Sequence, residues 1–347
     1  MTRRSAAPGE TAAAMPDAPG RLRRLRNPAL LPPVIVLACA ILLIIATKLM
    51  NPGAGFGQQL AAVLVTSVFL VVAAFGQGLT ILIGGIDLSI GIVIGIAAMM
   101  ISVLTDGRDA ALPWAVPLTL ATGGAIGGVN GAGIALAGVP PFIMTLASGI
   151  TFFGVGLGFT SGLAQEPVAP ALGLLMSGHC YGVPIPILLI IAFAVAASVF
   201  QNGTAVGRKL YAIGSSAGAA RVLGLPIAGL TILVYTLSGL CAAIAGLLLA
   251  GYSSAATLDM GTPLLLPTIA AVVIGGASVV GGSGTYFGTF AGAVFLSALG
   301  TVITVLSLSQ GLRNVIEGAI IVVALLSQGD RWRQLWTWLQ PQKRGRT

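Results

Sequence analysis

The chain has 347 residues, of which 56% are hydrophobic and only 7% are charged. Soluble domains carry roughly a quarter charged residues, so this composition excludes a water-soluble enzyme or binding module and predicts an integral membrane protein. The net charge of +8 comes mainly from Arg and Lys residues clustered near the two ends. Such clusters beside apolar spans are typical of cytoplasmic anchors, and we expect no nucleic acid as a partner.

The two ends of the chain differ in composition from the middle. Residues 1–29 are rich in Ala, Pro and Arg and are expected to form a disordered cytoplasmic tail, and 329–347 a basic cytoplasmic tail. Between them, a domain at 30–328 contains apolar stretches that predict about ten transmembrane helices at about 20 residues per crossing. These are expected near 33–49, 59–80, 89–105, 113–135, 141–160, 184–200, 228–251, 265–280, 285–305 and 312–327. The fold class is therefore predicted to be all-α, a polytopic membrane bundle.

The positions of the basic residues predict the orientation of this bundle. Fourteen of the 17 Lys and Arg residues fall in the two tails and in the loop 201–227. Because cytoplasmic loops are enriched in Lys and Arg, both termini and this loop are expected to be cytoplasmic. The loops at 51–58, 106–112, 161–183, 252–264 and 306–311 are then expected outside.

The stretch LIGGIDLSIG, residues 82–91, is the first polar break in the apolar pattern. A charge near the centre of a bilayer costs about 2.5–3.5 kcal/mol even on the lenient insertion scale, so Asp87 needs compensation. One interpretation is an N-cap near the cytoplasmic face, in which the carboxylate accepts bonds from the N–H groups of Ser89 and Ile90 at the positive end of a helix dipole. The other is a broken helix that offers polar groups to a substrate.

Glycines at four-residue spacing predict close contacts between helix backbones. Such faces are formed by Gly123, Gly127 and Gly131, by Gly124 and Gly128, by Gly154 and Gly158, and by Gly284, Gly288 and Gly292. A second glycine-rich break at 272–288 matches the first at four positions with an offset of 191 residues. In such glycine-rich sequence, four matches are weak evidence for an internal repeat.

Polar residues also punctuate the fourth and fifth spans, in GGVNGAGIALAGVPPFIMTLASGI at 127–150. Asn130 lies in an apolar helix and needs hydrogen-bond partners, so it is expected either to bond a neighbouring helix or to line a pathway. Pro140 and Pro141 suit the start of the next helix. Together with Asp87 and Ser89, we predict Asn130, Phe142 and Thr145 as residues of the pathway region.

The two longest loops have different character. The outer loop 161–183 contains His179 beside Cys180, which is too few ligands for a structural zinc site, and its VAPALGLLM segment is expected to pack as a short interfacial piece. In the cytoplasmic loop, Ser215 or Ser216 is expected to cap a short helix over 217–223, which Gly224 ends. Such a helix fits a groove of another protein or serves as a solvated connector.

The segments GGIDLSIG, NG followed by PPFIMTL, GRKLYAIGSSAGAARVLG and IGGASVVGGSGTYFGT, in this order, resemble the permease subunits of bacterial monosaccharide ABC importers of the ribose, xylose, galactose and arabinose type. The likeness covers residues 30–328. It departs from the family at Ser215–Ser216, where Gly-Asn is common, and at ASGI after PPFIMTL, and these departures bear on substrate and partner choice.

The resemblance implies a multi-pass protein of the bacterial inner membrane that works with cytoplasmic ATPase subunits, a periplasmic or extracellular substrate-binding protein and a second permease subunit, in a homodimer or a heterodimer. No cofactor of its own is expected, since ATP binds to the partner, and the chain lacks the Gly-Lys pair of a phosphate-binding loop. The family's coupling helix corresponds here to 207–224. The residues expected to couple to the ATPase are Gly207, Arg208, Tyr211, Gly214, Ala219, Ala220, Arg221 and Gly224.

Other transport and enzyme classes remain as alternatives. The permease could carry a non-sugar such as a nucleoside. An ion-coupled carrier would use intramembrane carboxylates, and only Asp87 and Glu317 are candidates; Glu317 is expected to pair with Arg313. An intramembrane serine enzyme would need Ser283 in GGSG within reach of His179, although these two residues are expected on opposite sides of the membrane.

Overall fold

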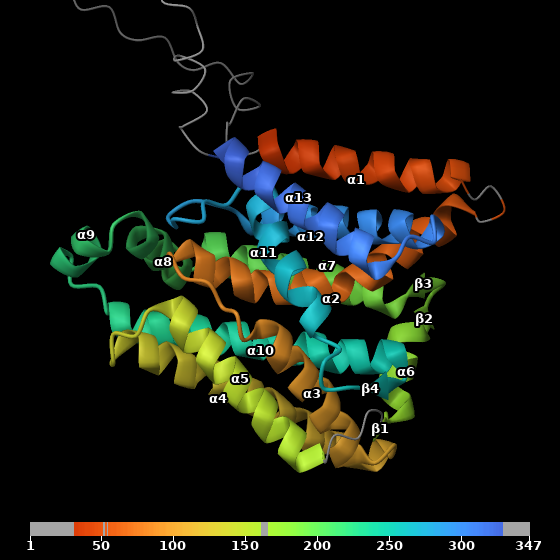
Figure 1. Cartoon of the computed structure of the whole chain (residues 1–347), viewed down its shortest axis with the longest axis horizontal. Helices are drawn as coiled ribbons and strands as arrows, with labels where there is room; N and C mark the ends of the chain where they lie inside the picture. Colours follow the sequence, from red (N-terminus) through yellow and green to blue (C-terminus); the bar gives the residue numbers. More distant parts are fainter. Residues whose placement is uncertain (1–30, 51–52, 54, 161–165, 329–347) are drawn as a thin grey trace, which may run out of the picture.

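A computed structural model describes residues 31–50, 53, 55–160 and 166–328 (Figure 1). The two tails predicted at 1–29 and 329–347 lie outside the described residues. Almost all of the described chain is helical, and its strands are two-residue segments that form two small antiparallel pairs, β1 with β4 and β2 with β3. The strands are β1 (Glu166–Pro167), β2 (His179–Cys180), β3 (Val183–Pro184) and β4 (Ala255–Ala256).

Each of the ten predicted spans coincides with a helix. These helices are α1 (Leu31–Met50), α2 (Phe56–Leu82), α3 (Ile90–Thr105), α4 (Leu112–Ala135), α5 (Pro141–Thr160), α7 (Ile185–Ser198), α10 (Ile227–Ser253), α11 (Leu265–Ile274), α12 (Tyr286–Val305) and α13 (Gln310–Gln328). The remaining helical elements are η2 (Asp109–Ala111), α6 (Pro170–Ser177), η3 (Val199–Gly203), α8 (Ala205–Ser215), α9 (Ala217–Val222) and η4 (Thr262–Leu264).

The prediction of an all-α polytopic membrane bundle is confirmed. Seven of the described helices are long and apolar enough to cross a membrane, whereas Ile90–Thr105 and Thr262–Ile274 are apolar but shorter. The predicted span at 265–280 overlaps α11 but is wrong beyond Ile274, where α11 ends and a loop follows. The number of ten crossings therefore stays a prediction.

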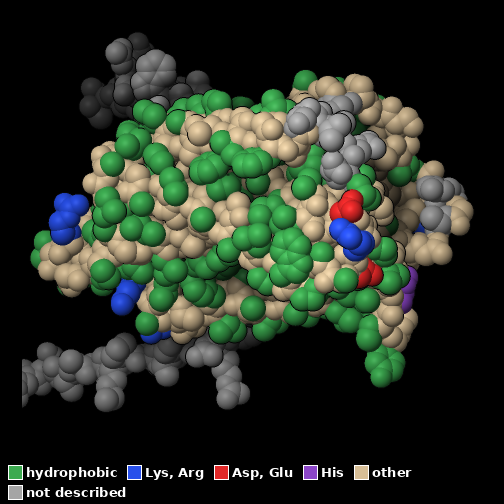
Figure 2. Space-filling view, turned by 90° about the horizontal axis from the view of Figure 1, so that it is seen from below, with side chains coloured by type: hydrophobic (Ala, Val, Ile, Leu, Met, Phe, Trp, Pro, Cys, Tyr) green, Lys and Arg blue, Asp and Glu red, His purple; other side chains and the backbone are tan. Residues whose placement is uncertain are grey.

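Charged side chains gather at the two ends of the bundle. In Figure 2, basic side chains lie at the end formed by α8 and α9, while acidic, basic and His side chains lie at the opposite end, and the face between them shows hydrophobic side chains but no charged ones. The strands and α6 lie at this second end (Figure 1). We call the α8–α9 end the coupling end and the other the strand end; the cytoplasmic placement of the coupling end stays a prediction.

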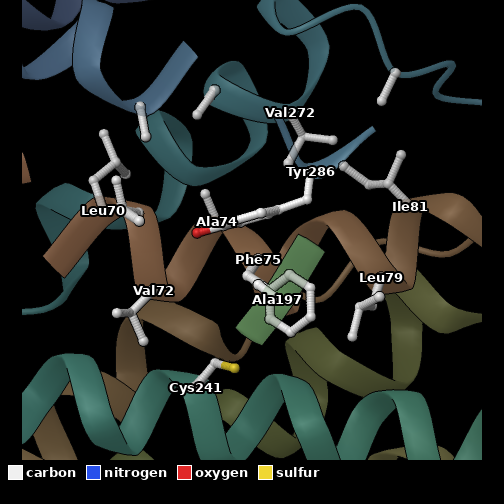
Figure 3. Close-up of a cluster of buried hydrophobic side chains, with 14 of the residues drawn as sticks. Leu70, Val72, Ala74, Phe75, Leu79, Ile81, Ala197, Cys241, Val272 and Tyr286 are labelled. Atoms are coloured by element: carbon white, nitrogen blue, oxygen red, sulfur yellow. The ribbon is translucent and has the colours of Figure 1, made fainter. Parts of the chain in front are cut away.

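The helices α2 and α10 form the centre of the bundle and are largely buried. Figure 3 shows α2 with Phe75 beneath Tyr286 and Val272, and with Cys241 of α10 on its other side. The rings of Phe75 and Tyr286 meet edge to face, with centroids 5.1 Å apart. Because lipid gives no hydrophobic drive between helices, such close contacts hold the bundle together.

Two of the predicted glycine faces make backbone contacts between helices. A methyl group at Gly127 of α4 would overlap the carbonyl oxygen of Tyr235 in α10, and one at Gly292 of α12 would overlap that of Ala271 in α11. By contrast, a methyl group at Gly154 or Gly158 of α5 would meet no described atom within 4 Å. The face of α5 is therefore not used for packing within the described chain.

The helices α2 and α11 end in the same way. After α2, Gly84 N–H bonds the Ile81 carbonyl and Gly85 N–H bonds the Thr80 carbonyl, both at 2.9 Å. After α11, Gly276 and Ala277 donate to the carbonyls of Val273 and Val272, at 3.0 and 3.2 Å. Gly84 and Gly276 have φ of +83° and +91°, the left-handed conformation that a Schellman ending requires. The two endings match at an offset of 192 residues, one more than the sequence comparison used.

The irregular segment 83–89 connects α2 to α3, and Asp87 is buried within it. Asp87 in this segment is bonded to Ser238 of α10 at 2.7 Å. At 1.5 Å per residue, Ser238 lies about 16 Å from the start of α10 and about 22 Å from its end. The expectation that Asp87 lies near the cytoplasmic face is therefore wrong, because its partner lies in the middle of α10, a helix of 27 residues that is long enough to cross a membrane.

Candidate functional site

Asp87 is the centre of a buried polar cluster. Its side chain is held by three donors, the Ser89 N–H at 2.9 Å, the Ser89 hydroxyl at 2.6 Å and the Ser238 hydroxyl at 2.7 Å. The residue is 1% exposed. The predicted bond from Ser89 is confirmed, but Ser89 itself occupies the N-cap position of α3, so Asp87 stands one residue before the cap. Three hydrogen bonds and the nearby helix N-terminus compensate much of the cost of the charge.

The remainder of the cluster ties the 83–89 segment to three further helices. Asn130 of α4 donates its side-chain N–H to the Ser89 hydroxyl at 2.9 Å, which confirms the prediction of an interhelical hydrogen bond. Thr145 of α5 accepts from the Leu88 N–H at 3.1 Å. Gln77 of α2, with its amide turned to suit its neighbours, donates to the Asp87 carbonyl at 3.0 Å and accepts from its N–H at 3.3 Å.

Four of the five predicted pathway residues thus meet in one cluster, and the fifth does not. Phe142 is 57% exposed at the start of α5 and does not join it. Asp87, Ser89, Asn130 and Thr145 are buried, so in this conformation they hold helices together, and a role in a pathway stays a prediction for all five residues.

Sequence reasoning missed Gln77, Ser238 and Tyr235. The signal that marks the first two is an isolated polar residue inside a long apolar helix, which must find a partner. Tyr235 of α10 is buried, and a methyl group at Gly85 would overlap its hydroxyl. Among the described residues, neither this hydroxyl nor the Asn130 side-chain oxygen has a hydrogen-bond partner.

The loop at the coupling end folds as two short helices, each begun by a side-chain cap, of which the one at Ser216 was predicted. The Thr204 hydroxyl accepts from Gly207 N–H at 3.0 Å to begin α8, and the Ser216 hydroxyl accepts from Ala219 N–H at 3.2 Å to begin α9. Gly224 follows α9 with a φ of +71°. The expected helix over 217–223 is confirmed to within one residue.

The eight predicted coupling residues divide into two groups. Gly207, Tyr211, Gly214 and Ala220 are buried or half-buried and pack α8 and α9 against the bundle, while Arg208, Ala219, Arg221 and Gly224 are exposed. The largest exposed apolar side chains of this loop were not predicted. These are Val222, 89% exposed, and Leu223, 74% exposed.

A three-way junction anchors α8 to the membrane helices. Tyr211 donates its hydroxyl to the Gly284 carbonyl at 2.6 Å and accepts from the Gln201 side chain at 2.9 Å. Burial raises the pKa of Tyr211, and the bond from Gln201 lowers it in part, so the hydroxyl keeps its proton to donate. Gly282 N–H bonds the Leu82 carbonyl at 2.9 Å. Leu82 is the last residue of α2, five positions before Asp87.

The sequence matches the family model described as the permease component of the branched-chain amino acid transport system, over residues 59–325. The chain belongs to this permease family. It is 34% identical to a probable ABC transporter permease of Sinorhizobium fredii, over 84% of this chain and 87% of that protein. It is 32% identical to a ribose import permease of Haemophilus influenzae, over 83% and 90%. An autoinducer 2 import system permease of Photorhabdus luminescens is 31% identical, over 79% and 85%. No solved structure was found to match.

The geometry bears on the two rival classes. Arg313 and Glu317 form the predicted ion pair at 2.8 Å, and the Asp87 carboxylate already has three donors, so the two carboxylates that the sequence suggested for ion coupling are both engaged. Ser283 lies in the loop that contacts α8, whereas His179 lies in β2 at the strand end (Figure 1). A base and a nucleophile at opposite ends cannot share a proton.

Proposed function

We propose that the permease is the membrane subunit of an ABC importer that carries a monosaccharide into the cell, driven by ATP hydrolysis in separate subunits. The similarity to a ribose import permease and to an autoinducer 2 import permease supports this assignment. The observation that carries it is the α8–α9 unit, a capped pair of short helices that projects from a membrane bundle and is anchored on two loops between its helices.

The exposed surface of this unit suits an ATPase subunit as its partner. Val222 and Leu223 form an apolar tip, and Arg221 adds a positive charge beside it. Exposed apolar side chains at the centre of a polar surface are typical of protein interfaces. We expect the tip to fill an apolar groove of the ATPase and Arg221 to meet an acidic group at its edge.

The remaining parts of the assembly are part of the same proposal. We place ten crossings in the bacterial inner membrane with both termini in the cytoplasm, an external binding protein at the strand end and a second permease copy beside the first. The similar permeases are described as importing different substrates. Binding experiments with the cognate binding protein will distinguish among monosaccharides, and between a monosaccharide and a nucleoside.

The proposed function is tested by transport in proteoliposomes that contain the permease, its ATPase subunit and its binding protein. We expect uptake of labelled sugar with ATP, and none with an ATPase variant that cannot hydrolyse it. Sugar uptake at the full rate without the ATPase, driven by a proton gradient, would contradict the proposal.

A variant pair tests the docking surface in the same assay. Leu223→Asp places a charge in the proposed ATPase contact and is expected to lower ATP-driven uptake at least tenfold, since the loss of one buried apolar contact costs about 1.5–3 kcal/mol. Leu136→Asp is the matched control, because Leu136, at the end of α4, is 73% exposed. Equal uptake by the two variants would show that the tip does not contact the ATPase.

A further inference from the structure

The segment between α10 and α11 enters the bundle from the strand end, although the sequence analysis places 252–264 in an outer loop. It begins at β4, which pairs with β1. It then runs along α3, where a methyl group at Gly95 would overlap the Leu258 carbonyl and one at Gly261 would overlap the Gly91 carbonyl. Gly95 and Gly91 lie about 15 and 21 Å from the end of α3 at 1.5 Å per residue.

A second helix gives a similar depth. A methyl group at Gly246 of α10 would overlap the Ile94 carbonyl of α3, and Gly246 is about 10 Å from the end of α10. Both helices therefore place 258–261 well inside a hydrocarbon layer about 30 Å thick. The backbone of this segment forms successive turns and not an α-helix, with bonds from Met260 N–H to the Thr257 carbonyl and from Leu264 N–H to the Gly261 carbonyl. Such irregular backbone occurs at this depth only where protein buries it or water reaches it.

Asp259 and Thr262 are exposed polar residues of the deep part of this segment. They flank one turn, in which Thr262 N–H bonds the Asp259 carbonyl at 2.9 Å. Among the described residues, the Asp259 carboxylate has no ion-pair or hydrogen-bond partner. An exposed carboxylate facing lipid would cost at least about 2.5 kcal/mol, so Asp259 is expected to face water or a polar solute.

Other deep sites suit a hydroxyl-rich solute less well. A groove of about 470 Å³ between α3, α4 and α5 has apolar walls, and its two hydroxyl groups, of Thr122 and Thr160, are bonded to carbonyls of their own helices. The carboxylate of Asp87 is buried and bonded to its own cluster. Asp259 and Thr262 instead combine exposure with free polar groups at membrane depth.

We propose that the Asp259 carboxylate and the Thr262 hydroxyl form a contact site for the hydroxyl groups of the solute on the strand-end half of the pathway. This inference rests on the proposed function and adds to it a site within the membrane. A carboxylate accepts strong hydrogen bonds from hydroxyl groups, and the Thr262 hydroxyl both donates and accepts. The site would take a neutral polyhydroxylated solute as it leaves the external binding protein.

Accessibility is the first test, and it does not depend on transport. In a Cys180→Ser background, which removes the exposed native cysteine, Asp259→Cys is expected to react with a membrane-impermeant charged thiol reagent, and ribose at high concentration is expected to slow the reaction. Leu42→Cys in α1 is the control, since Leu42 is 64% exposed on an apolar helix about 12 Å from its end. Equal, low reactivity of both cysteines would overturn the proposal.

Transport is the second test, in the complete complex with ATPase and binding protein. Asp259→Ala is expected to lower the uptake rate about 10- to 100-fold, because a hydrogen bond to a charged group contributes about 1.5–3 kcal/mol. Asp259→Asn, which keeps an acceptor, is expected to be intermediate. Asp106→Asn removes the same charge from an exposed ion pair at the strand end and is expected to leave uptake unchanged.

The outcomes separate this inference from the proposed function. If the wild-type complex shows no ATP-dependent uptake, the proposed function fails. If the wild type transports and Asp259→Ala matches it, the contact site is wrong while the function stands. If Asp259→Ala instead dissociates a pair of permease copies in size-exclusion chromatography, Asp259 belongs to an interface between copies and the proposal is overturned as well.

Discussion

The bond between Ser238 and Asp87 should account for a measurable part of the stability of the bundle. Ser238→Ala removes the one described donor to the second carboxylate oxygen of Asp87. Asp87 is 1% exposed, so the loss of this donor should remove the full contribution of a hydrogen bond to a charged group, about 1.5–3 kcal/mol. A neutral interhelical bond in a membrane would contribute only about 0.6 kcal/mol on average, so the measured value distinguishes the two cases.

The matched control is Ser67→Ala in α2. Ser67 is fully buried like Ser238, but its hydroxyl bonds only the Leu64 carbonyl of its own helix, at 2.8 Å. This variant should change the free energy of unfolding by no more than about 0.5 kcal/mol, since alanine also improves helix propensity. Unfolding in mixed micelles with increasing sodium dodecyl sulfate, followed by circular dichroism, measures both variants. If Ser238→Ala costs no more than Ser67→Ala, the buried carboxylate is not held by Ser238.

Two further perturbations test the packing and the junction. Gly127→Ala should lower the free energy of unfolding by about 1–3 kcal/mol or more, because the added methyl group meets the backbone of α10. Gly154→Ala is the control: its methyl group meets no described atom, so the free energy of unfolding should change by no more than about 0.5 kcal/mol in the same assay. Equal losses of stability would contradict the packing of α4 on α10. Tyr211→Phe removes the hydroxyl that bonds Gly284 and should leave ATP hydrolysis intact while the sugar transported per ATP falls several-fold; an unchanged ratio would show that the junction carries no coupling.

Local features of this fold could be predicted from the sequence because their causes are local. The helices follow from apolar runs of crossing length, and α9 follows from Ser216, Gly224 and Pro226, whose effects reach only a few residues. The glycine spacing predicted a packing face on α4, where it is confirmed. The glycines with the same spacing on α5 contact no described helix. Glycine spacing shows that another helix can approach closely, but it does not show which helix does so.

Depth and partnership could not be predicted, because both depend on contacts between distant segments. Asp87 and Ser238 are 151 residues apart, and no periodicity links them. An N-cap at a membrane surface and an N-cap in the middle of a bundle share one local pattern, so Asp87 was placed at the wrong depth. The segment 254–264 resembles an outer loop for the same reason, since a polar, irregular stretch is expected in water unless its neighbours are known.

The positions of the junction and the cluster make a physical case for coupling by displacement. The Leu82 carbonyl accepts a hydrogen bond from Gly282 N–H, and a methyl group at Gly214 of α8 would overlap the same carbonyl. A movement of α8 toward α2 therefore has to displace both the loop that follows α2 and the loop that precedes α12. Five residues beyond Leu82, the Asp87 carboxylate is fixed to Ser89 and Ser238. Since packed interiors transmit strain and do not absorb it, a push on α8, where we propose that the ATPase docks, would reach the middle of α10 through a short stretch of backbone. The strength of the Asp87–Ser238 bond would then determine whether α3 and α10 move together or separate under that push.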